Sequence, residues 1–230
     1  MGRGLSNTSL VGIFGVVKAV VDFCIKEQGL DCKNAFSGVY LPAESNKKRM
    51  PIKNGKLKDL QKECFNLDDD IRWLAALTND TGMRLSEALG LIWDDIYLDH
   101  EYPHISLTPH PWRPLKTSSS KRLIPLVGAA HEAVKIMHRQ RSTPFLFNSY
   151  TDPNGCNGNS CSAALNKWLK QHVPDAVIHS FRHSFRDRLR NAGVQSEMID
   201  QLGGWSNQSV GQRYGDGFDL RTLQKALDLI

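Results

Sequence analysis

The chain has 230 residues, of which 40% are hydrophobic, so it can bury a core in one large domain or in one medium domain with a smaller appendage. A formal charge of +5 and a sequence pI near 9.0 favour a polyanionic partner without establishing one. No run approaches the roughly 20 apolar residues that span a bilayer, because Lys18 and Asp22 interrupt the most apolar segment. These properties argue against an integral membrane protein.

Five cysteines, an odd number without framework spacing, suit a reducing cytosol, and a cytoplasmic location is therefore expected. Cys156 and Cys161, together with His172 and His179, raise the possibility of a zinc site. Their spacing fits none of the common zinc motifs. The sequence therefore predicts neither a bound metal nor a cofactor.

The N-terminal residues 5–40 are predicted to be helical and then loop-like. Ser9 is a candidate cap for this helix, which the apolar run from Leu10 is expected to bury. Its apolar positions recur at intervals of three and four: Ile13, Val16, Val17, Val20 and Val21. Residues 42–56 carry five lysines or arginines and two prolines, which is typical of a linker. We therefore expect an N-terminal helical segment at 1–41, a basic linker at 42–56 and a main domain at 57–230.

The main domain is predicted to open with helices and then to form strands. Asp68, Asp69 and Asp70 precede the apolar run IRWLAAL, where carboxylates favour a helix N-terminus more than a metal site. A second helix is expected to start near Arg84 and to end before Trp93. Strands are expected at 95–98, 104–108 and 122–126, and a loop rich in Pro, Ser and Lys joins the last two.

Everything later in the chain has helical periodicity. Helices are predicted at 128–140, 161–171, 179–193, 195–204 and 219–230. Gly193 and the Gly-Gly pair at 203–204 are natural helix ends, and Asp219 is a candidate cap for the last helix. The predicted class is α+β, mainly α-helical, with a small antiparallel β-sheet.

Two arginines and a tyrosine lie in patterns that indicate phosphate chemistry. Arg84 lies in TGMRLSEALGLIWDDI (81–96), and Arg182 lies in HSFRHSF (179–185). Tyr214 ends the run LGGWSNQSVGQRY, which begins at Leu202. Guanidinium groups bind phosphate oxygens through a planar fork, and a phenol can attack phosphorus. Together these groups describe a covalent phosphoryl-transfer site.

The order Arg, then HxxR, then Trp and Tyr nine residues apart resembles the catalytic half of the tyrosine recombinases, the phage integrase family. The resemblance covers residues 57–216 in detail. It implies the DNA breaking-rejoining fold and site-specific cleavage and rejoining of double-stranded DNA through a 3′-phosphotyrosine. It also implies that the reaction needs neither ATP nor a metal. Integration or excision of a phage or mobile element is the expected context.

The resemblance also implies residue roles. Arg84 and Arg182 would bind the phosphodiester, and Tyr214 would be the nucleophile. Lys116, in KTSSSKRLIPL (116–126), would donate a proton to the leaving 5′-oxygen, with Lys121 as the alternative. His179 would accept or donate a proton near the nucleophile or at a phosphate oxygen.

The remaining members of the pattern have supporting roles. Glu87 would orient the guanidinium of Arg84, although a surface ion pair three residues apart is the simpler interpretation. His183 would pack or support the phosphate, and Trp205 would contribute packing and one hydrogen bond. An apolar stripe in the last helix would pack on its own domain or contact a neighbouring protomer on DNA: Leu220, Leu223, Leu227 and Ile230.

Residues 5–40 resemble the end of the helical core-binding (SAM-like) domain of these recombinases, whose remainder is not in this sequence. We therefore expect the sequence to be a fragment. Two alternatives remain open at this point. A type IB topoisomerase shares the Arg, Arg, His and Tyr chemistry, and a DNA-binding regulator would retain the fold without catalysis. The match around Arg84 favours a recombinase over the first, and the complete set of residues argues against the second.

Overall fold

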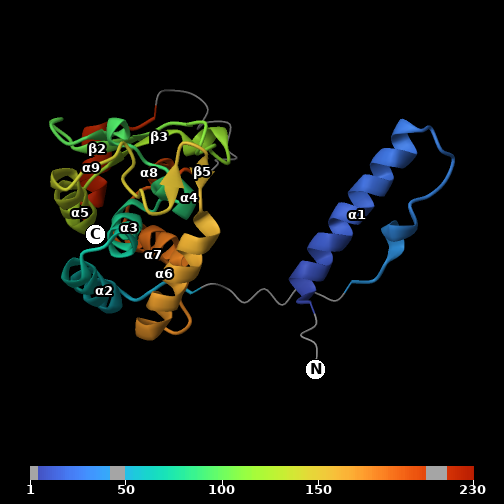
Figure 1. Ribbon diagram of the computed structural model, residues 1–230, viewed down its shortest axis with the longest axis horizontal. Helices are drawn as coiled ribbons and strands as arrows, with labels where there is room; N and C mark the ends of the chain where they lie inside the picture. Colours follow the sequence, from blue (N-terminus) through green and yellow to red (C-terminus); the bar gives the residue numbers. More distant parts are fainter. Residues whose placement is uncertain (1–4, 42–49, 206–216) are drawn as a thin grey trace. The chain divides into compact units, whose positions relative to one another are not determined.

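The computed structural model describes residues 5–41, 50–205 and 217–230, which fall into two compact units, Met1–Lys48 and Arg49–Ile230 (Figure 1). Each unit is described by itself. The second is mainly helical with small antiparallel sheets, which confirms the predicted class.

The first unit is one helix with a returning segment. Helix α1 (Asn7–Glu27) is followed by the short 3-10 helix η1 (Ala35–Gly38). The Asn34 amide ties the return to α1 by donating to the carbonyl of Lys18 and to Asp22 Oδ1, at 2.9 and 2.8 Å. The predicted cap at Ser9 is wrong, because Ser6 accepts from the Ser9 amide and begins the helix three residues earlier.

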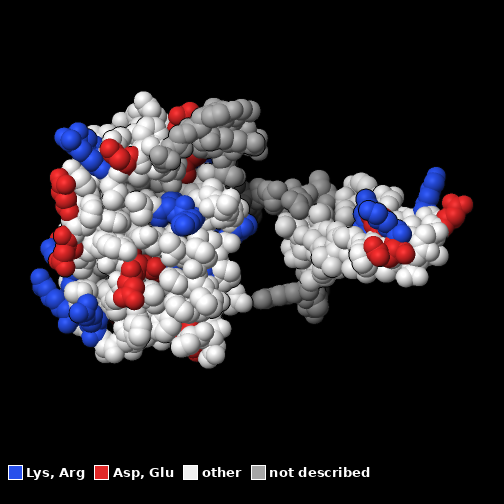
Figure 2. Space-filling view, turned by 90° about the horizontal axis from the view of Figure 1, so that it is seen from above, with Lys and Arg blue, Asp and Glu red and all other residues white. Residues whose placement is uncertain are grey.

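Helix α1 is also not buried within this unit, contrary to expectation. A single returning segment cannot cover its circumference, so Val16, Val20 and Phe23 are more than half exposed. Much of the face of this unit seen in Figure 2 is uncharged. Helix α1 has 21 residues and contains an 18-residue window with a mean hydropathy of 1.9, so by length and composition alone it could cross a membrane. The expectation that no segment reaches that length was wrong, although signal sequences and core helices have the same properties.

The second unit begins earlier in the sequence than the predicted linker allows. Ile52 is only 4% exposed, and its amide and carbonyl both bond the hydroxyl of Ser184. Helix α2 (Asn54–Leu67) starts inside the range expected to be linker. The basic residues and Gly55 made this segment resemble a linker in the sequence. The helix is stabilised by the packing of Leu57 and Leu60 rather than by local propensity.

Helix α3 (Asp70–Thr81) lies in the middle of the second unit, in contact with α2, α5, α6 and α7 (Figure 1). The acidic triplet begins this helix as predicted. Asp69 caps it by accepting from the Arg72 amide, Asp68 accepts from the indole of Trp73, and Asp70 accepts from Ser149. Each carboxylate therefore has a structural role at the helix start.

Helix α4 (Leu85–Leu89) ends several residues before Trp93 and leads through η2 (Trp93–Asp95) into a three-stranded antiparallel sheet. Its strands, in the order β1-β2-β3, are Ile96–Tyr97, His104–Leu107 and Arg122–Pro125, with η3 (Ser118–Ser120) before the last. The register pairs Ile105 with Ile124 and Leu107 with Arg122. Each strand is slightly shorter than predicted.

The remaining helices follow the prediction closely. They are α5 (Gly128–Arg139), α6 (Gly158–His172), α7 (Ile178–Asn191), α8 (Ser196–Gly203) and α9 (Leu220–Leu227). Gly193 and Gly204 follow α7 and α8 with φ of 76° and 61°, and Asp219 caps α9. One hairpin was not predicted. Strands β4 (Thr151–Asp152) and β5 (Gly155–Cys156) have two residues each, too few to show alternation.

Two apolar clusters hold the unit together. The larger is built around α3, and the smaller joins α7, α8 and α9 through Phe185, Leu189, Leu202, Leu223 and Leu227. The apolar face of α9 therefore packs on its own unit, as the first of the two sequence interpretations holds. The same packing fixes α7 and the end of α8, which carry much of the predicted site.

Candidate active site

Arg84 lies at the junction of two helices, immediately before α4, with its backbone extended at φ −70° and ψ 149°. Its guanidinium binds Glu87 Oε1, and Nη1 also donates to Ser120 Oγ at 2.9 Å. Nη2 donates to the carbonyl of Gly204 at 3.2 Å. The side chain remains 22% exposed, so one arginine connects α4, the β2–β3 loop and the end of α8 while still facing solvent.

Glu87 is buried and shared between two guanidinium groups. Its Oε2 accepts from the Arg84 amide at 3.0 Å and from Arg122 Nη2 at 3.1 Å. Burial by itself raises the pKa of a carboxyl group, but Arg122 and Arg84 outweigh it and hold the pKa of Glu87 below its ordinary value. The burial of Glu87 excludes its interpretation as a surface ion pair, and its carboxylate binds both the guanidinium and the amide of Arg84.

Arg182 lies in the second turn of α7 and is only 3% exposed. Nη1 donates to the carbonyl of Gly82, whereas the buried Nη2 has no hydrogen-bond partner among the described residues. Burial, and then the neighbouring charges of Arg84 and Arg122, lower the pKa of Arg182 to about 9, which still leaves it protonated at neutral pH. A buried cation with an unused N–H is a strong donor for an anion.

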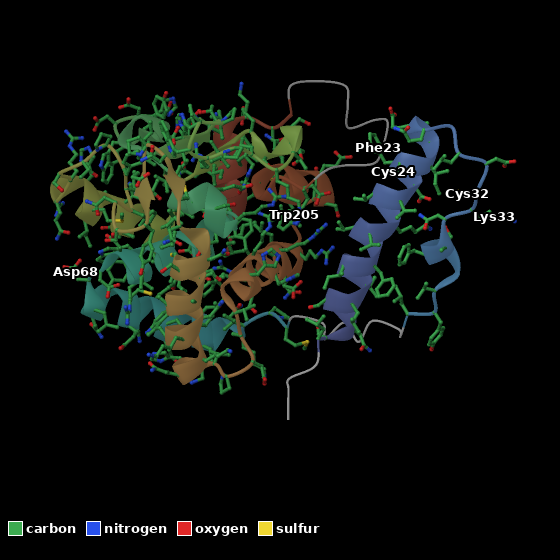
Figure 3. The ribbon with its side chains drawn as sticks, turned by 45° about the vertical axis from the view of Figure 1, so that its right-hand side comes forward. Phe23, Cys24, Cys32, Lys33, Asp68 and Trp205 are labelled. Atoms are coloured by element: carbon green, nitrogen blue, oxygen red, sulfur yellow. The ribbon has the colours of Figure 1, made fainter. Side chains whose placement is uncertain are left out.

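Trp205 follows α8, where Figure 3 labels it, and its ring is covered by two cations. The guanidinium carbons of Arg182 and Arg186 lie 4.1 and 4.7 Å from the ring centroid, and Arg186 is in turn paired with Asp200 at 3.0 Å. Trp205 thus holds Arg182 through a cation–π contact. This contact was not foreseen from the sequence, which predicted packing and one hydrogen bond.

Two glycines in left-handed conformation present carbonyl groups to the two arginines. Gly82, with φ of 60°, accepts from Arg182, and Gly204, with φ of 61°, accepts from Arg84. A Cβ atom at Gly82 would lie 2.3 Å from the ring of Phe185, and one at Gly204 would lie 2.6 Å from Arg122 Nη1. Close packing and positive φ both require glycine here.

The β2–β3 loop carries the predicted lysine and is anchored on both sides of it. Arg113, which is buried, donates to the backbone carbonyl of Glu87 and pairs with Asp95 at 3.1 Å. Further along, Ser120 contacts Arg84. Lys116 lies exposed between these two anchors, and Lys121, also exposed, follows η3. The structure therefore places both candidate lysines on the loop that reaches Arg84, without deciding between them.

His179 and His183 lie one turn apart on α7, with ring centroids 5.1 Å apart in an edge-to-face arrangement. His179 is half-buried and begins the turn that carries Arg182, whereas His183 is exposed. Tyr214, the predicted nucleophile, lies outside the described residues. The structure thus brings together Arg84, Glu87, Arg182 and Trp205, and the position of Tyr214 stays a prediction.

The electrostatics of this cluster favour an anion. Three guanidinium groups (Arg84, Arg122 and Arg182) surround one carboxylate, Glu87, which leaves an excess of two positive charges at a partly open position. On the face shown in Figure 2, in contrast, acidic and basic side chains of this unit are interspersed. A phosphate with two non-bridging oxygens would satisfy the unused N–H of Arg182 and the excess charge together.

Sequence reasoning missed the contributions of Arg122, Ser120 and Arg186. Arg122 had been noted only as part of the RLIPL pattern after the loop. The structure shows that Arg122 lies opposite Leu107 and on the same face of β3 as the buried Ile124, a placement that the sequence alone did not indicate. No local pattern distinguishes Arg186 from an ordinary helix-surface arginine.

Comparison with known proteins identifies the family of this chain. The model of the phage integrase family matches residues 53–221. The tyrosine recombinase XerC of Pediococcus pentosaceus is 26% identical over 92% of this chain and 72% of its own length. XerC of Neisseria meningitidis is 29% identical over 61% of this chain and 46% of its own length. The Tn1549 transposon integrase, solved with a circular intermediate DNA, is 20% identical with a TM-score of 0.65 over 98% of this chain and 75% of its own.

The chain therefore belongs to the phage integrase family, the tyrosine recombinases that the sequence resembles. It spans about half the length of some of the curated relatives that it matches. These matches do not favour the topoisomerase or the regulator as alternatives.

Proposed function

We propose that this chain is a site-specific DNA strand transferase that cleaves and rejoins double-stranded DNA through a phosphotyrosine at Tyr214. The observation that carries the proposal is the positively charged cluster of Arg84 and Arg182, in which the buried Nη2 of Arg182 has no partner among the described residues. Recombinases and a DNA-bound transposon integrase among the similar proteins support DNA as the partner.

In this proposal the two arginines bind the non-bridging oxygens of one phosphodiester and stabilise the charge that develops there. The Tyr214 oxygen attacks phosphorus, a P–O bond to tyrosine forms, and the bond to the 5′-oxygen breaks. Lys116 gives a proton to that leaving oxygen, and His179 accepts the proton of the phenol or serves a phosphate oxygen. The phosphotyrosine ester keeps the free energy of the broken DNA phosphodiester, so rejoining by the reverse reaction needs no ATP.

The cations of the site take the part that a metal ion plays in other phosphoryl transferases. Cleavage is therefore expected to proceed in EDTA. Trp205 keeps Arg182 in place, and Glu87 keeps Arg84 in place. Assembly of two or more copies on DNA belongs to the same proposal. The apolar face of α9 is packed within its own unit, so a contact through the C-terminal segment would use its exposed side, which includes Leu229.

The test is formation of a covalent adduct on nicked suicide duplexes, from which the cleaved fragment diffuses away. A pool with a randomised core removes the need to know the site in advance. We expect a slowly migrating band on a denaturing gel, formed in EDTA and absent for Tyr214→Phe. Tyr97→Phe, at a half-exposed tyrosine of β1, is the matched control and should retain the band. An adduct that persists in Tyr214→Phe would contradict the assignment.

A further inference from the structure

A third cation, which is buried, lies beside the two arginines proposed to bind the phosphate. Arg122 begins β3, directly opposite Leu107, and its side chain is only 3% exposed. Burial is the largest influence on its pKa, followed by the opposing charge of Glu87, and the pKa is lowered. Its three nitrogens all donate to groups of the protein, whereas Nη2 of Arg182 has no partner among the described residues, so the place of Arg122 in the site needs another explanation.

Two nitrogens of Arg122 bind residues that contact Arg84, and the third binds the end of α8, which Arg84 also contacts. Nη2 donates to Glu87 Oε2 at 3.1 Å, and Glu87 binds the guanidinium and the amide of Arg84. Nη1 donates to the carbonyl of Ser120 at 2.7 Å, and Ser120 Oγ contacts Arg84. Nε donates to the carbonyl of Leu202 at 2.8 Å, two residues before the Gly204 carbonyl that Arg84 also binds.

The two arginines therefore share one scaffold of three segments: α4, the β2–β3 loop and the end of α8. Arg122 joins these segments from inside, and Arg84 joins the same segments on the solvent side. Glycine at 204 is required for this arrangement, since a Cβ atom there would lie 2.6 Å from Arg122 Nη1. In sequence, the end of α8 leads directly to residues 206–216 and hence to Tyr214.

We propose that Arg122 is a positioning residue, which fixes Glu87 and the end of α8 so that Arg84 presents its guanidinium to the phosphate. The inference rests on the proposed function. Stability alone is a weak reason for such a buried pair, because well-packed apolar residues often replace buried ion pairs without loss. The shared carboxylate is the more specific reason. Its two oxygens bind the guanidinium and the amide of Arg84, and Arg122 fixes one of those oxygens.

A double-mutant cycle on the 230-residue chain tests the inference, with the adduct-forming rate on the suicide duplex pool as the readout. Arg122→Gln should slow adduct formation at least about tenfold when Arg84 is present. In an Arg84→Ala background the same change should cost less than about twofold, because the group that Arg122 positions is gone. A residue that only stabilises the fold would slow both backgrounds by the same factor, and that result would overturn the inference.

Arg113 supplies the matched control. It is as deeply buried as Arg122, but it contacts the backbone carbonyl of Glu87 rather than its carboxylate. The loss caused by Arg113→Gln should therefore be nearly the same with and without Arg84. If Arg113→Gln couples to Arg84→Ala as strongly as Arg122→Gln does, the coupling is a general effect of buried arginines and the proposal fails.

The cycle is repeated with Arg122→Lys, which keeps the charge and replaces Arg122→Gln if that variant fails to fold. Lysine can reach one of the three acceptors but cannot bridge them, so the rate should recover only in part while the melting temperature recovers largely. Full recovery of the rate would contradict a geometric role. If the unmodified chain forms no adduct at all, the proposed function fails. If it does and the cycle is additive, only the role of Arg122 fails.

Discussion

At the scale of single residues, the central feature is a cluster of arginines held by backbone carbonyls, a tryptophan ring and one carboxylate. Arg84 and Arg182 each donate from one nitrogen to a glycine carbonyl and keep other N–H groups available. The fork geometry matters as much as the charge, because two parallel donors can match two phosphate oxygens.

Substitution of these arginines should therefore separate charge from geometry. Arg84→Ala and Arg182→Ala are each expected to slow adduct formation by about a hundredfold or more, the scale of one lost donor to a developing oxyanion. Lysine at either position should rescue poorly, since a point charge lacks the fork. Single-turnover adduct kinetics measure this. Arg190→Ala, at an exposed arginine of the same helix α7, is the control and should stay near the unmodified rate. Near-complete rescue by lysine would show that charge alone suffices.

Glu87 predicts a specific pH dependence of stability. Its pKa is lowered in the folded chain, so its ionised pairing stabilises the fold above the unfolded value of about 4.3 and is lost as pH falls through the folded value. Glu87→Gln should be destabilising at neutral pH, and the difference in unfolding free energy should shrink below about pH 4. Urea titrations of the unmodified chain and of Glu87→Gln, from pH 7 to acid pH, measure this difference.

Comparing the unmodified chain with Glu87→Gln separates the effect of Glu87 from that of Asp80, which both chains contain. Burial raises the pKa of Asp80, so its effect on the pH dependence of stability has the opposite sign. A difference that stays constant down to acid pH would mean that the charge of Glu87 does not contribute.

At the scale of elements, the helices and their ends were largely predictable because the signals are local. Apolar periodicity located α3 and α5 to α9, and Gly193, Gly204 and Asp219 marked ends as expected. The start of the second unit was not predictable, since Ile52 is fixed by Ser184, which lies 132 residues away in sequence. The hairpin of β4 and β5 was too short to leave a pattern.

The candidate site shows the same contrast between local sequence patterns and contacts that join residues far apart in the sequence. Arg84, Arg182 and Trp205 lie in recognisable motifs, and the structure brings them together. The pairing of Arg122 with Glu87 spans 35 residues, and in sequence Arg122 looks like any basic residue after a serine-rich loop. The roles of Lys116, His179 and Tyr214 remain predictions.

Glycine at the end of α3 should matter more than glycine at the end of α7. Both adopt positive φ, so alanine costs roughly 1 to 2 kcal/mol at either position from backbone strain alone. At Gly82 the new Cβ would also overlap the buried ring of Phe185, whereas at Gly193 nothing lies within 4 Å. Gly82→Ala is therefore expected to lower the unfolding free energy clearly more than Gly193→Ala in urea denaturation. Equal losses would mean that the contact with Phe185 relaxes at no cost.

At the scale of the whole molecule, the charge distribution predicts how the chain binds DNA. Arg84, Arg122 and Arg182 leave an excess of positive charge at the site, while acidic and basic side chains are interspersed on the face of the second unit shown in Figure 2. Contacts to phosphates position a protein without reading sequence. We expect affinity to fall steeply and linearly on a log–log plot against salt, with a slope of about −0.9 per phosphate neutralised.

Discrimination between duplexes should accordingly be small. Titration of labelled core-site and random duplexes, at two salt concentrations, should give affinities within roughly tenfold of one another. The core sites come from duplexes recovered in the covalent-adduct selection. Discrimination of about a thousandfold at physiological salt would show that this chain reads base sequence by itself.

The central claim is that a tyrosine of this chain becomes joined to DNA, and peptide mapping of the adduct tests it most directly. Trypsin cuts after Arg213 and Arg221, so residues 214–221 contain Tyr214 and no other tyrosine. After reaction in EDTA and digestion of the DNA and the protein, this peptide is predicted to carry a nucleotide through a phosphodiester to its tyrosine. A nucleotide on any other peptide, or an adduct that forms only with Mg²⁺, would contradict the account.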